Sequence, residues 1–219
     1  MKRKVAMTAI AAVPIVVALA LAPQVSAGAR GPGAGVKVYT ATLTPLNAGT
    51  HDIKGRTLVL PAATGNATIT LRGDVVTVHI AMEGVTAGDI HPQHIHAGPR
   101  CPGPSADVNH DGFLDVIEGL PDYGPILVNL DSDLSSNPAG TFPVADGSGV
   151  NETSSYAYSA TGSRSHIQDE IQTALKLGTR HVVIHGIDLS SGLPDTVATL
   201  GDLPNELTLP VACGELTQQ

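Results

Sequence analysis

Apolar and polar residues alternate along many short stretches of the chain, the pattern of β-strands with one buried face. The clearest stretch is residues 75–82, VVTVHIAM, in which every second residue from Val76 to Met82 is apolar. These side chains emerge on one face of a strand. A Gly73-Asp74 turn precedes the stretch and joins it to the alternating residues before it. The pattern therefore predicts a β-hairpin over residues 66–82.

Similar stretches recur along the chain and are separated by Gly, Pro, Asn and Ser. One segment has a different period, because Ile167, Ile171 and Leu175 are four residues apart between a capping box at Ser165 and Gly178. Many short strands with one helix predict a mainly β fold, an antiparallel sandwich or barrel with long loops. The other predicted strands are residues 36–46, 57–60, 125–130, 141–144, 154–159, 181–187 and 207–213.

The first residues have the pattern of an export signal. The chain starts MKRK, continues with an apolar run over residues 5–22 broken by Pro14, and reaches a small-x-small ending at Ala27. A membrane anchor is the alternative, but the basic start, the proline and the small residues favour cleavage near Ala27. We therefore expect a secreted protein with a signal peptide at 1–27, a flexible leader at 28–35 and one β domain at 36–219. No later segment is apolar over enough residues to cross a bilayer.

Charge and cysteine content narrow the choice of partners. The net charge of -8 becomes about -11 once Lys2, Arg3 and Lys4 are removed with the signal peptide. This excess of acidic groups argues against nucleic acid and anionic lipid as partners. The chain has two cysteines, Cys101 and Cys213. In an oxidising compartment we expect them to pair with each other.

Residues 107–118, DVNHDGFLDVIE, match the twelve-residue calcium loop of the EF-hand, with Gly112 at the sharp turn. The alternative is a solvated acidic turn. We expect no flanking helices, because Pro104 precedes the loop and Pro121 follows it closely. Calcium would then act as a staple that orders the loop and would not open a helix pair. The predicted ligands are Asp107, Asn109, Asp111, the carbonyl oxygen of Phe113, Asp115 and Glu118.

Histidines are concentrated in two segments, residues 91–96 and the predicted strand 181–187. His94 and His96 are two residues apart, and His181 and His185 are four apart, so each pair emerges on one face of its strand. A His-x-His pair on one face is suited to binding a transition metal. The alternative is that these imidazoles only donate to backbone carbonyl oxygens. His91 is either a further ligand or a turn residue.

The sequence also resembles Cu/Zn superoxide dismutases in three short motifs. These are QHIHAG at 93–98 followed by Cys101, GTRHVVIH at 178–185 and ACG at 212–214. The resemblance implies a Greek-key β-sandwich, a bond between Cys101 and Cys213, and a copper site. By this resemblance the copper ligands are His94, His96 and His185.

The chain departs from that family at several positions. No set of zinc ligands is found, because His110 is the only histidine between Cys101 and His166, and it lies inside the predicted calcium loop. Pro210 replaces the arginine that guides the anion in the family. Strong attraction of superoxide is therefore not expected, given the net negative charge. Possible extra ligands for a metal are His91, His110 and His181.

A second resemblance covers most of residues 36–213. The segments YTATL at 39–43, GNATITL at 65–71, VTVHI at 76–80 and the histidine segment at 93–98 look like the chordin-type CHRD domain of secreted bacterial proteins.

Two functions follow as hypotheses. The first is a secreted CHRD-like domain stabilised by calcium and a disulfide that holds copper. The alternative is a copper-only, superoxide dismutase-like oxidoreductase. The sequence identifies no catalytic residue and no protein partner.

Overall fold

The computed structural model describes residues 35–134, 139–145, 154–163 and 180–219. All described elements belong to one compact unit, residues 34–219. The predicted signal peptide and the helix expected at 165–178 lie outside the described residues. Within the described part of the chain, no helix is both long enough and apolar enough to cross a membrane.

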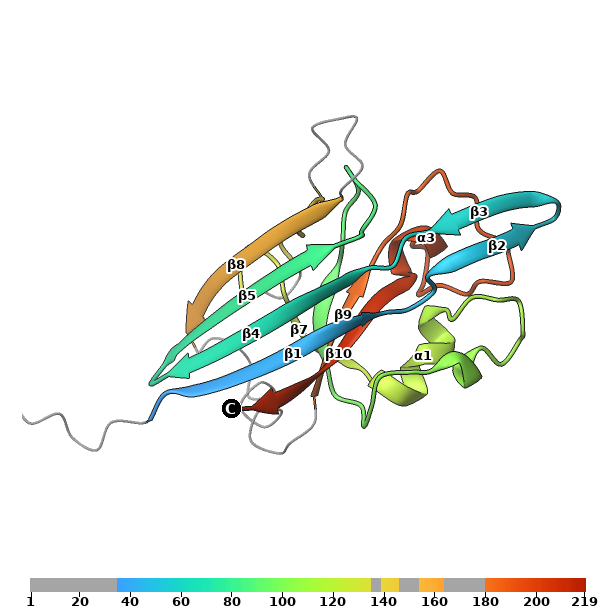
Figure 1. The fold of residues 1–219 in the computed structure, drawn as a ribbon. Helices are drawn as coiled ribbons and strands as arrows, with labels where there is room; N and C mark the ends of the chain where they lie inside the picture. The colour runs from blue at the N-terminus through green and yellow to red at the C-terminus, as the bar shows by residue number, and fades with distance from the viewer. Residues whose placement is uncertain (1–34, 135–138, 146–153, 164–179) are drawn as a thin grey trace, which may run out of the picture. The chain divides into compact units, whose positions relative to one another are not determined.

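Eight antiparallel strands form one curled sheet in the order β7-β6-β9-β10-β1-β4-β5-β8, and β2 and β3 form a separate hairpin (Figure 1). The mainly β, antiparallel fold that the sequence predicts is confirmed. The strands are β1 Lys37–Pro45, β2 Gly49–Ile53, β3 Arg56–Leu60, β4 Thr64–Arg72, β5 Val75–Glu83, β6 Gln93–His96, β7 Ile126–Asn129, β8 Ser155–Ser163, β9 Arg180–His185 and β10 Pro210–Gln218. The helices are the 3-10 turn η1 Pro104–Ala106, α1 Val116–Tyr123 and α3 Asn205–Thr208.

The hairpin of β4 and β5 follows the predicted alternation. Val76, Val78, Ile80 and Met82 are buried in the main core, whereas the residues between them are more exposed. Gly73 forms the turn with φ 59°, a backbone conformation that glycine adopts without steric cost. Sequence periodicity thus sets the register of these strands, because a shift of one residue would turn the apolar side chains to solvent.

The connections between strands follow a Greek-key pattern. β4 to β5, β6 to β7 and β9 to β10 join neighbours in the sheet, whereas β5 to β6, β7 to β8 and β8 to β9 cross to distant strands. The first and last strands, β1 and β10, pair with each other. This arrangement places β6 beside β9, two strands that are far apart in the sequence.

The two edges of the curled sheet approach each other through tyrosine side chains of β8. The hydroxyl of Tyr156 donates to Oε1 of Gln93 in β6 at 3.0 Å, and that of Tyr158 donates to the carbonyl of Asp131 at 2.7 Å. The tyrosine rings and the inward residues of the sheet share one apolar core. Burial of this core is the main contribution to the stability of the fold.

The structure corrects several of the sequence predictions. The strand predicted at 207–213 begins only at Pro210, because residues 207 and 208 belong to α3. Residues 141–144 do not form a strand, and Val144 makes only an isolated bridge to Ile90. A helix does flank the predicted calcium loop, although the prolines argued against it. The side chain of Asp115 accepts from the backbone of Glu118, and the side chain of Glu118 accepts from the backbone of Asp115. This capping box starts α1, which contains Pro121 near its C-terminal end.

The hairpin of β2 and β3 was predicted only in part, as a strand at 57–60. Its turn places Lys54 at φ 52° and Gly55 at φ 84°, the two positive values that a tight hairpin turn requires. His51 lies in β2 and stacks on Phe113 of the predicted calcium loop, with ring centroids 4.3 Å apart. This hairpin therefore packs against the loop that follows η1.

Candidate metal centre

Two neighbouring strands carry the histidines of the candidate site. On β6, Ile95 points into the main core, so His94 and His96 emerge on the opposite face of the sheet. On β9, Ile184 likewise belongs to the main core, and His185 follows it on that opposite face. The pairing of β6 with β9 brings the two sets together. The same-face prediction for the His-x-His pair is confirmed.

The three imidazoles form one buried cluster, as the sequence predicted. Each of His94, His96 and His185 offers a ligand nitrogen, and these atoms all lie within 4.8 Å of one another. The ring centroids of His94 are 5.6 Å from those of His96 and 5.3 Å from those of His185. Two nitrogens that share an ion at about 2.0 Å are at most about 4 Å apart. A small inward shift of the rings is therefore enough to bind one ion.

The other ring nitrogens of two of these residues are held by the backbone. Nδ1 of His96 lies 2.8 Å from the carbonyl oxygen of Gly124, and Nδ1 of His185 lies 2.8 Å from that of Thr208. Because a carbonyl can only accept, each Nδ1 carries the proton and each Nε2 presents a lone pair. This arrangement is typical of metal-bound histidines.

The ligand nitrogens themselves have no hydrogen-bond partner. Nδ1 of His94 and Nε2 of His96 and His185 are buried and unpaired. Leaving a buried polar atom unpaired costs about 1–3 kcal/mol, so each such atom calls for an explanation. An ion bound to all three nitrogens satisfies them together. Imidazole ligands are suited to copper, zinc, iron and nickel.

The electrostatics of the cluster keep these rings neutral. Burial lowers the pKa of His185 to about 4, although the hydrogen bond to Thr208 partly opposes this effect. Burial and the proximity of His185 lower the pKa of His96 to about 3. Burial, His185 and His96 together hold the pKa of His94 well below its usual value. The lone pairs are consequently available near neutral pH.

The C-terminal end of α1 covers the cluster. Tyr123 is fully buried, and its ring packs edge-on against His96 with centroids 4.7 Å apart. Its hydroxyl donates to the carbonyl of Val116 at 2.9 Å, which fixes the ring. Burial and the charge of Asp115 raise the pKa of Tyr123, so the ring remains a neutral phenol. Gly124, which holds His96, is the next residue in the chain.

The disulfide lies on the same face of the sheet as the histidines. The predicted bond between Cys101 and Cys213 is confirmed, with a Cα–Cα distance of 5.8 Å. Cys213 packs with Val183 of β9 and Tyr123 in a small second core. Gly98 contacts the end of α1 so closely that an added Cβ would lie 2.1 Å from the carbonyl oxygen of Asp122. These contacts hold α1 against the histidine-bearing strands.

The three other candidate histidines are not part of this cluster. The nitrogens of His91 lie 3.1 Å from the carbonyl of His185 and 3.0 Å from that of Thr86. His181 is buried opposite His96 in the ladder, but no nitrogen of it joins the group. His110 is exposed in the loop at φ 58°. None of the three has a nitrogen in the group formed by His94, His96 and His185, although both nitrogens of His181 are buried and unpaired.

The predicted calcium loop is closed by its own acidic side chains. Oε1 of Glu118 accepts from the backbone of Val108 at 2.9 Å and of Asn109 at 3.1 Å, so the twelfth position lies over the start of the loop. Oδ2 of Asp107 accepts from Gly112 at 3.1 Å, but its Oδ1 is buried without a partner. The backbone thus already has a compact loop form with an unsatisfied carboxylate oxygen. The assignment of calcium itself stays a prediction.

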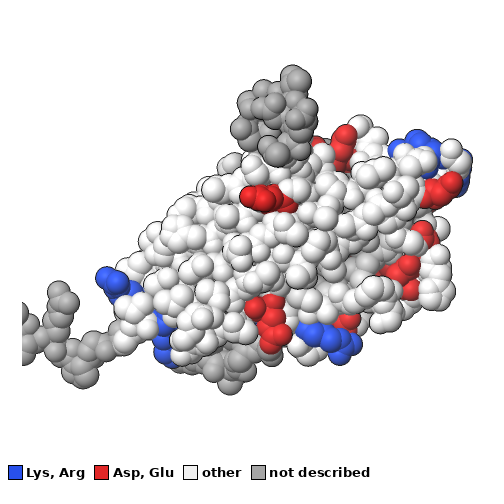
Figure 2. Space-filling model, in the orientation of Figure 1, with Lys and Arg blue, Asp and Glu red and all other residues white. Residues whose placement is uncertain are grey.

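A cavity of about 490 Å³ opens beside the histidine cluster. One wall consists of His94, His96 and His185, and most of the other lining side chains are apolar. Among the described residues that line it there is no Lys, Arg, Asp or Glu. Charged side chains are likewise few on the face of the molecule drawn in Figure 2, where most of the surface is uncharged. The site is therefore a buried histidine cluster beside an apolar hollow.

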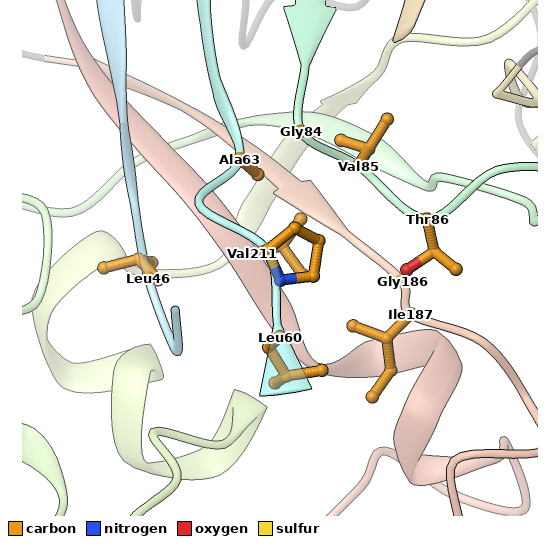
Figure 3. Close-up of a pocket in the computed structure, with 10 residues that line it drawn as sticks. Leu46, Leu60, Ala63, Gly84, Val85, Thr86, Gly186, Ile187 and Val211 are labelled. Atoms are coloured by element: carbon orange, nitrogen blue, oxygen red, sulfur yellow. The ribbon is translucent and has the colours of Figure 1, made fainter. Parts of the chain in front are cut away.

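A second hollow is too small to be a functional site. It lies near the start of β4, and Figure 3 shows Leu60, Val85 and Ile187 around it. Its volume is about 10 Å³, roughly the space of one water molecule. Its walls are mostly apolar, so it offers little polar surface for a ligand.

Sequence reasoning missed the groups that hold and cover the ligands. Tyr123 has no sequence signal for this role, because it lies in a helix that the prolines argued against. The carbonyl oxygens of Gly124 and Thr208 belong to segments far from the histidines in sequence. Comparisons with models of known protein families and with curated protein sequences found no match.

Proposed function

We propose that this protein is an exported metal-binding β domain that holds one copper ion on His94, His96 and His185. The observation that carries the proposal is the convergence of three buried, unpaired imidazole nitrogens. Copper is preferred to other metals because the same three residues are the copper ligands implied by the resemblance to Cu/Zn superoxide dismutases. The confirmed disulfide is consistent with an oxidising compartment.

The residues of the chain have distinct tasks at this site. His94, His96 and His185 bind the ion, whereas the carbonyls of Gly124 and Thr208 orient two of the rings. Tyr123 and the apolar walls of the cavity limit access of water. When bound, copper supplies a centre that cycles between two oxidation states.

We also propose that residues 107–118 bind calcium as a structural staple. The support is the match to all ligand positions of the EF-hand loop, together with the buried, unpaired Oδ1 of Asp107. A calcium ion would offset the repulsion among four carboxylates in this loop.

The proposed family of the chain, a CHRD-like or superoxide dismutase-like domain, rests on the short motifs and on the Greek-key order of the strands.

A copper-only dismutase is the second candidate. This candidate is favoured because the three copper ligands that the resemblance implies lie close together in the structure. The cavity disfavours it, because no cation lines its described wall and Pro210 replaces the guiding arginine. Superoxide is an anion, and its fast capture depends on a positive local field. We therefore place metal binding ahead of dismutation.

Copper stoichiometry tests the main proposal. Purified mature protein is loaded with copper, passed through a desalting column and measured by mass spectrometry of the metal. We expect one copper per chain in the wild type and none in the variant in which His94, His96 and His185 are all alanine.

The control is His79→Ala, which removes an exposed histidine of β5 and should leave one copper per chain. Unchanged copper in the triple variant would refute the ligand assignment. A superoxide decay assay on the loaded protein separates the two candidates. A rate equal to that of the triple variant supports the binding domain, and a much faster rate supports the dismutase.

A further inference from the structure

The cavity beside the histidines has the properties of a binding site for an organic molecule. Its volume of about 490 Å³ lies within the range of small-molecule sites, which are mostly apolar with a few polar groups. Here the polar groups are concentrated on the histidine wall. The largely apolar side chains of the cavity include Leu120, Tyr123, Ile126, Phe142, Leu200 and Leu203.

Several of these side chains remain partly exposed although they are large and aliphatic. The exposed fractions are 38% for Leu120, 44% for Ile126, 40% for Leu200 and 50% for Leu203. They come from α1, β7 and the segment before α3, so three separate parts of the chain present apolar surface to one hollow. Covering this surface with an apolar molecule is favourable in proportion to the area removed from water.

The wall also disfavours a small, hydrated anion as the natural occupant. No charged side chain is found among the described residues that line the cavity. An anion that enters such a space loses its hydration and gains no fixed positive partner other than the metal itself. An apolar molecule loses nothing comparable. A single donor atom is sufficient for it to reach the metal, because the three imidazoles supply the other ligands.

The aromatic residues of the wall favour a ring-shaped occupant. Phe142 meets His94 edge-on with centroids 6.1 Å apart, and Tyr123 meets His96 in the same way. Aromatic rings prefer such edge-to-face neighbours. Because Tyr123 and the three histidines are buried, the hollow has one buried aromatic side, and its exposed aliphatic side chains lie toward solvent.

We infer that this cavity binds a small organic molecule with an aromatic, ring-sized apolar body and one metal-ligating donor atom. The buried, unpaired nitrogens of His94, His96 and His185 place the metal at its inner wall, so the inference rests on the proposed function. Leu200 and Leu203 contact the apolar body and select for it. They are binding residues and take no part in the coordination of the metal.

Two azoles that share a donor test the inference on copper-loaded protein. Imidazole supplies the donor alone, whereas phenylimidazole adds an aromatic ring to the same donor. Binding is followed through the visible absorption of copper(II). We expect phenylimidazole to bind at least about tenfold more tightly, since burial of a ring removes a large apolar area from water.

Leu203→Ser tests which residue selects the ring. It should weaken phenylimidazole severalfold and leave imidazole unchanged. Leu189→Ser is the matched control, because Leu189 is as exposed as Leu203, at 52%, but does not line the cavity. It should change neither affinity. Both positions are on the surface, so the fold is expected to tolerate the two changes.

Failure of the inference and failure of the proposed function give different results. If copper is bound by the three histidines but the two azoles bind equally, the inference is wrong and the proposed function stands. If the protein takes up no copper, the proposed function and the role of the donor atom both fail. The apolar part is then judged on metal-free protein with the uncharged dye Nile red. If Leu203→Ser lowers the Nile red fluorescence and Leu189→Ser does not, the cavity binds an apolar body as inferred. Equal fluorescence in both variants contradicts this.

Discussion

At the scale of single residues, the site depends on which ring nitrogen carries the proton. The backbone carbonyls of Gly124 and Thr208 fix Nδ1–H on His96 and His185, so the Nε2 atom of each ring has a free lone pair. Alternation on a strand was enough to predict that His94 and His96 share a face. It could not predict the carbonyl partners, because tertiary packing alone brings those segments to the rings.

The lowered pKa values predict how stability depends on pH. An unfolded histidine has a pKa near 6.5, whereas folding lowers that of His185 to about 4 and that of His96 to about 3. Between these pKa values the unfolded chain binds more protons than the folded chain, so the free energy of unfolding rises with pH. In metal-free protein we expect stability to fall as pH decreases from about 6.5 to about 4.

Urea unfolding at several pH values measures this effect. Carboxylates also titrate in part of this range, so the informative comparison is with His96→Gln and with the exposed-histidine control His79→Gln. The first change should flatten the dependence on pH and the second should leave it unaltered. Equal slopes in all three proteins would show that His96 is not held neutral by the fold.

At the scale of elements, α1 connects the two proposed sites. Asp115 and Glu118 form its capping box and also occupy positions nine and twelve of the predicted calcium loop. At the other end of α1, Tyr123 packs on His96, and the carbonyl oxygen of Gly124 accepts a hydrogen bond from Nδ1 of His96. The sequence predicted the loop but no helix after it, because Pro121 was given more weight than the capping residues Asp115 and Glu118. An ion in the loop would therefore order the residues that orient His96, one of the proposed copper ligands.

Calcium should consequently stabilise the protein and strengthen copper binding. We expect millimolar calcium to raise the melting temperature of metal-free protein and to increase its copper affinity severalfold, because both ions favour the same position of α1. Thermal melts and copper titrations in calcium and in chelator measure the two effects.

Glu118→Gln should remove most of both gains, because it weakens the ligand at the twelfth position. Asp195→Asn is a suitable control, since Asp195 is exposed outside the loop. A melting temperature that does not respond to calcium would end the staple proposal. A normal thermal response with unchanged copper affinity would contradict the coupling through α1.

At the scale of the whole molecule, the curled sheet joins segments that are far apart in the sequence. The short alternating strands were enough to predict an antiparallel β fold, because burial of one face specifies each strand locally. The hydrophobic pattern did not give the order of the strands. It depends on long crossing connections that leave no periodic signal, and only the family resemblance implied it.

The disulfide links two segments that are far apart in the sequence. It joins residues 112 apart, so in the chain-entropy model it contributes about 4–5 kcal/mol to stability. Cys101→Ser with Cys213→Ser should lower the free energy of unfolding by about this amount, as measured by urea unfolding. Reduction of the wild type should give a similar loss, and a change below about 1 kcal/mol in both would show that the bond adds little to the fold.

The central claim is that three histidines brought together by β6 and β9 hold one metal ion. Diffraction from crystals of the copper-loaded protein, with data on both sides of the copper absorption edge, tests it most directly. We expect one anomalous peak per chain within bonding distance of Nδ1 of His94 and Nε2 of His96 and His185. A copper peak located elsewhere, with these three nitrogens still unpaired, would contradict it.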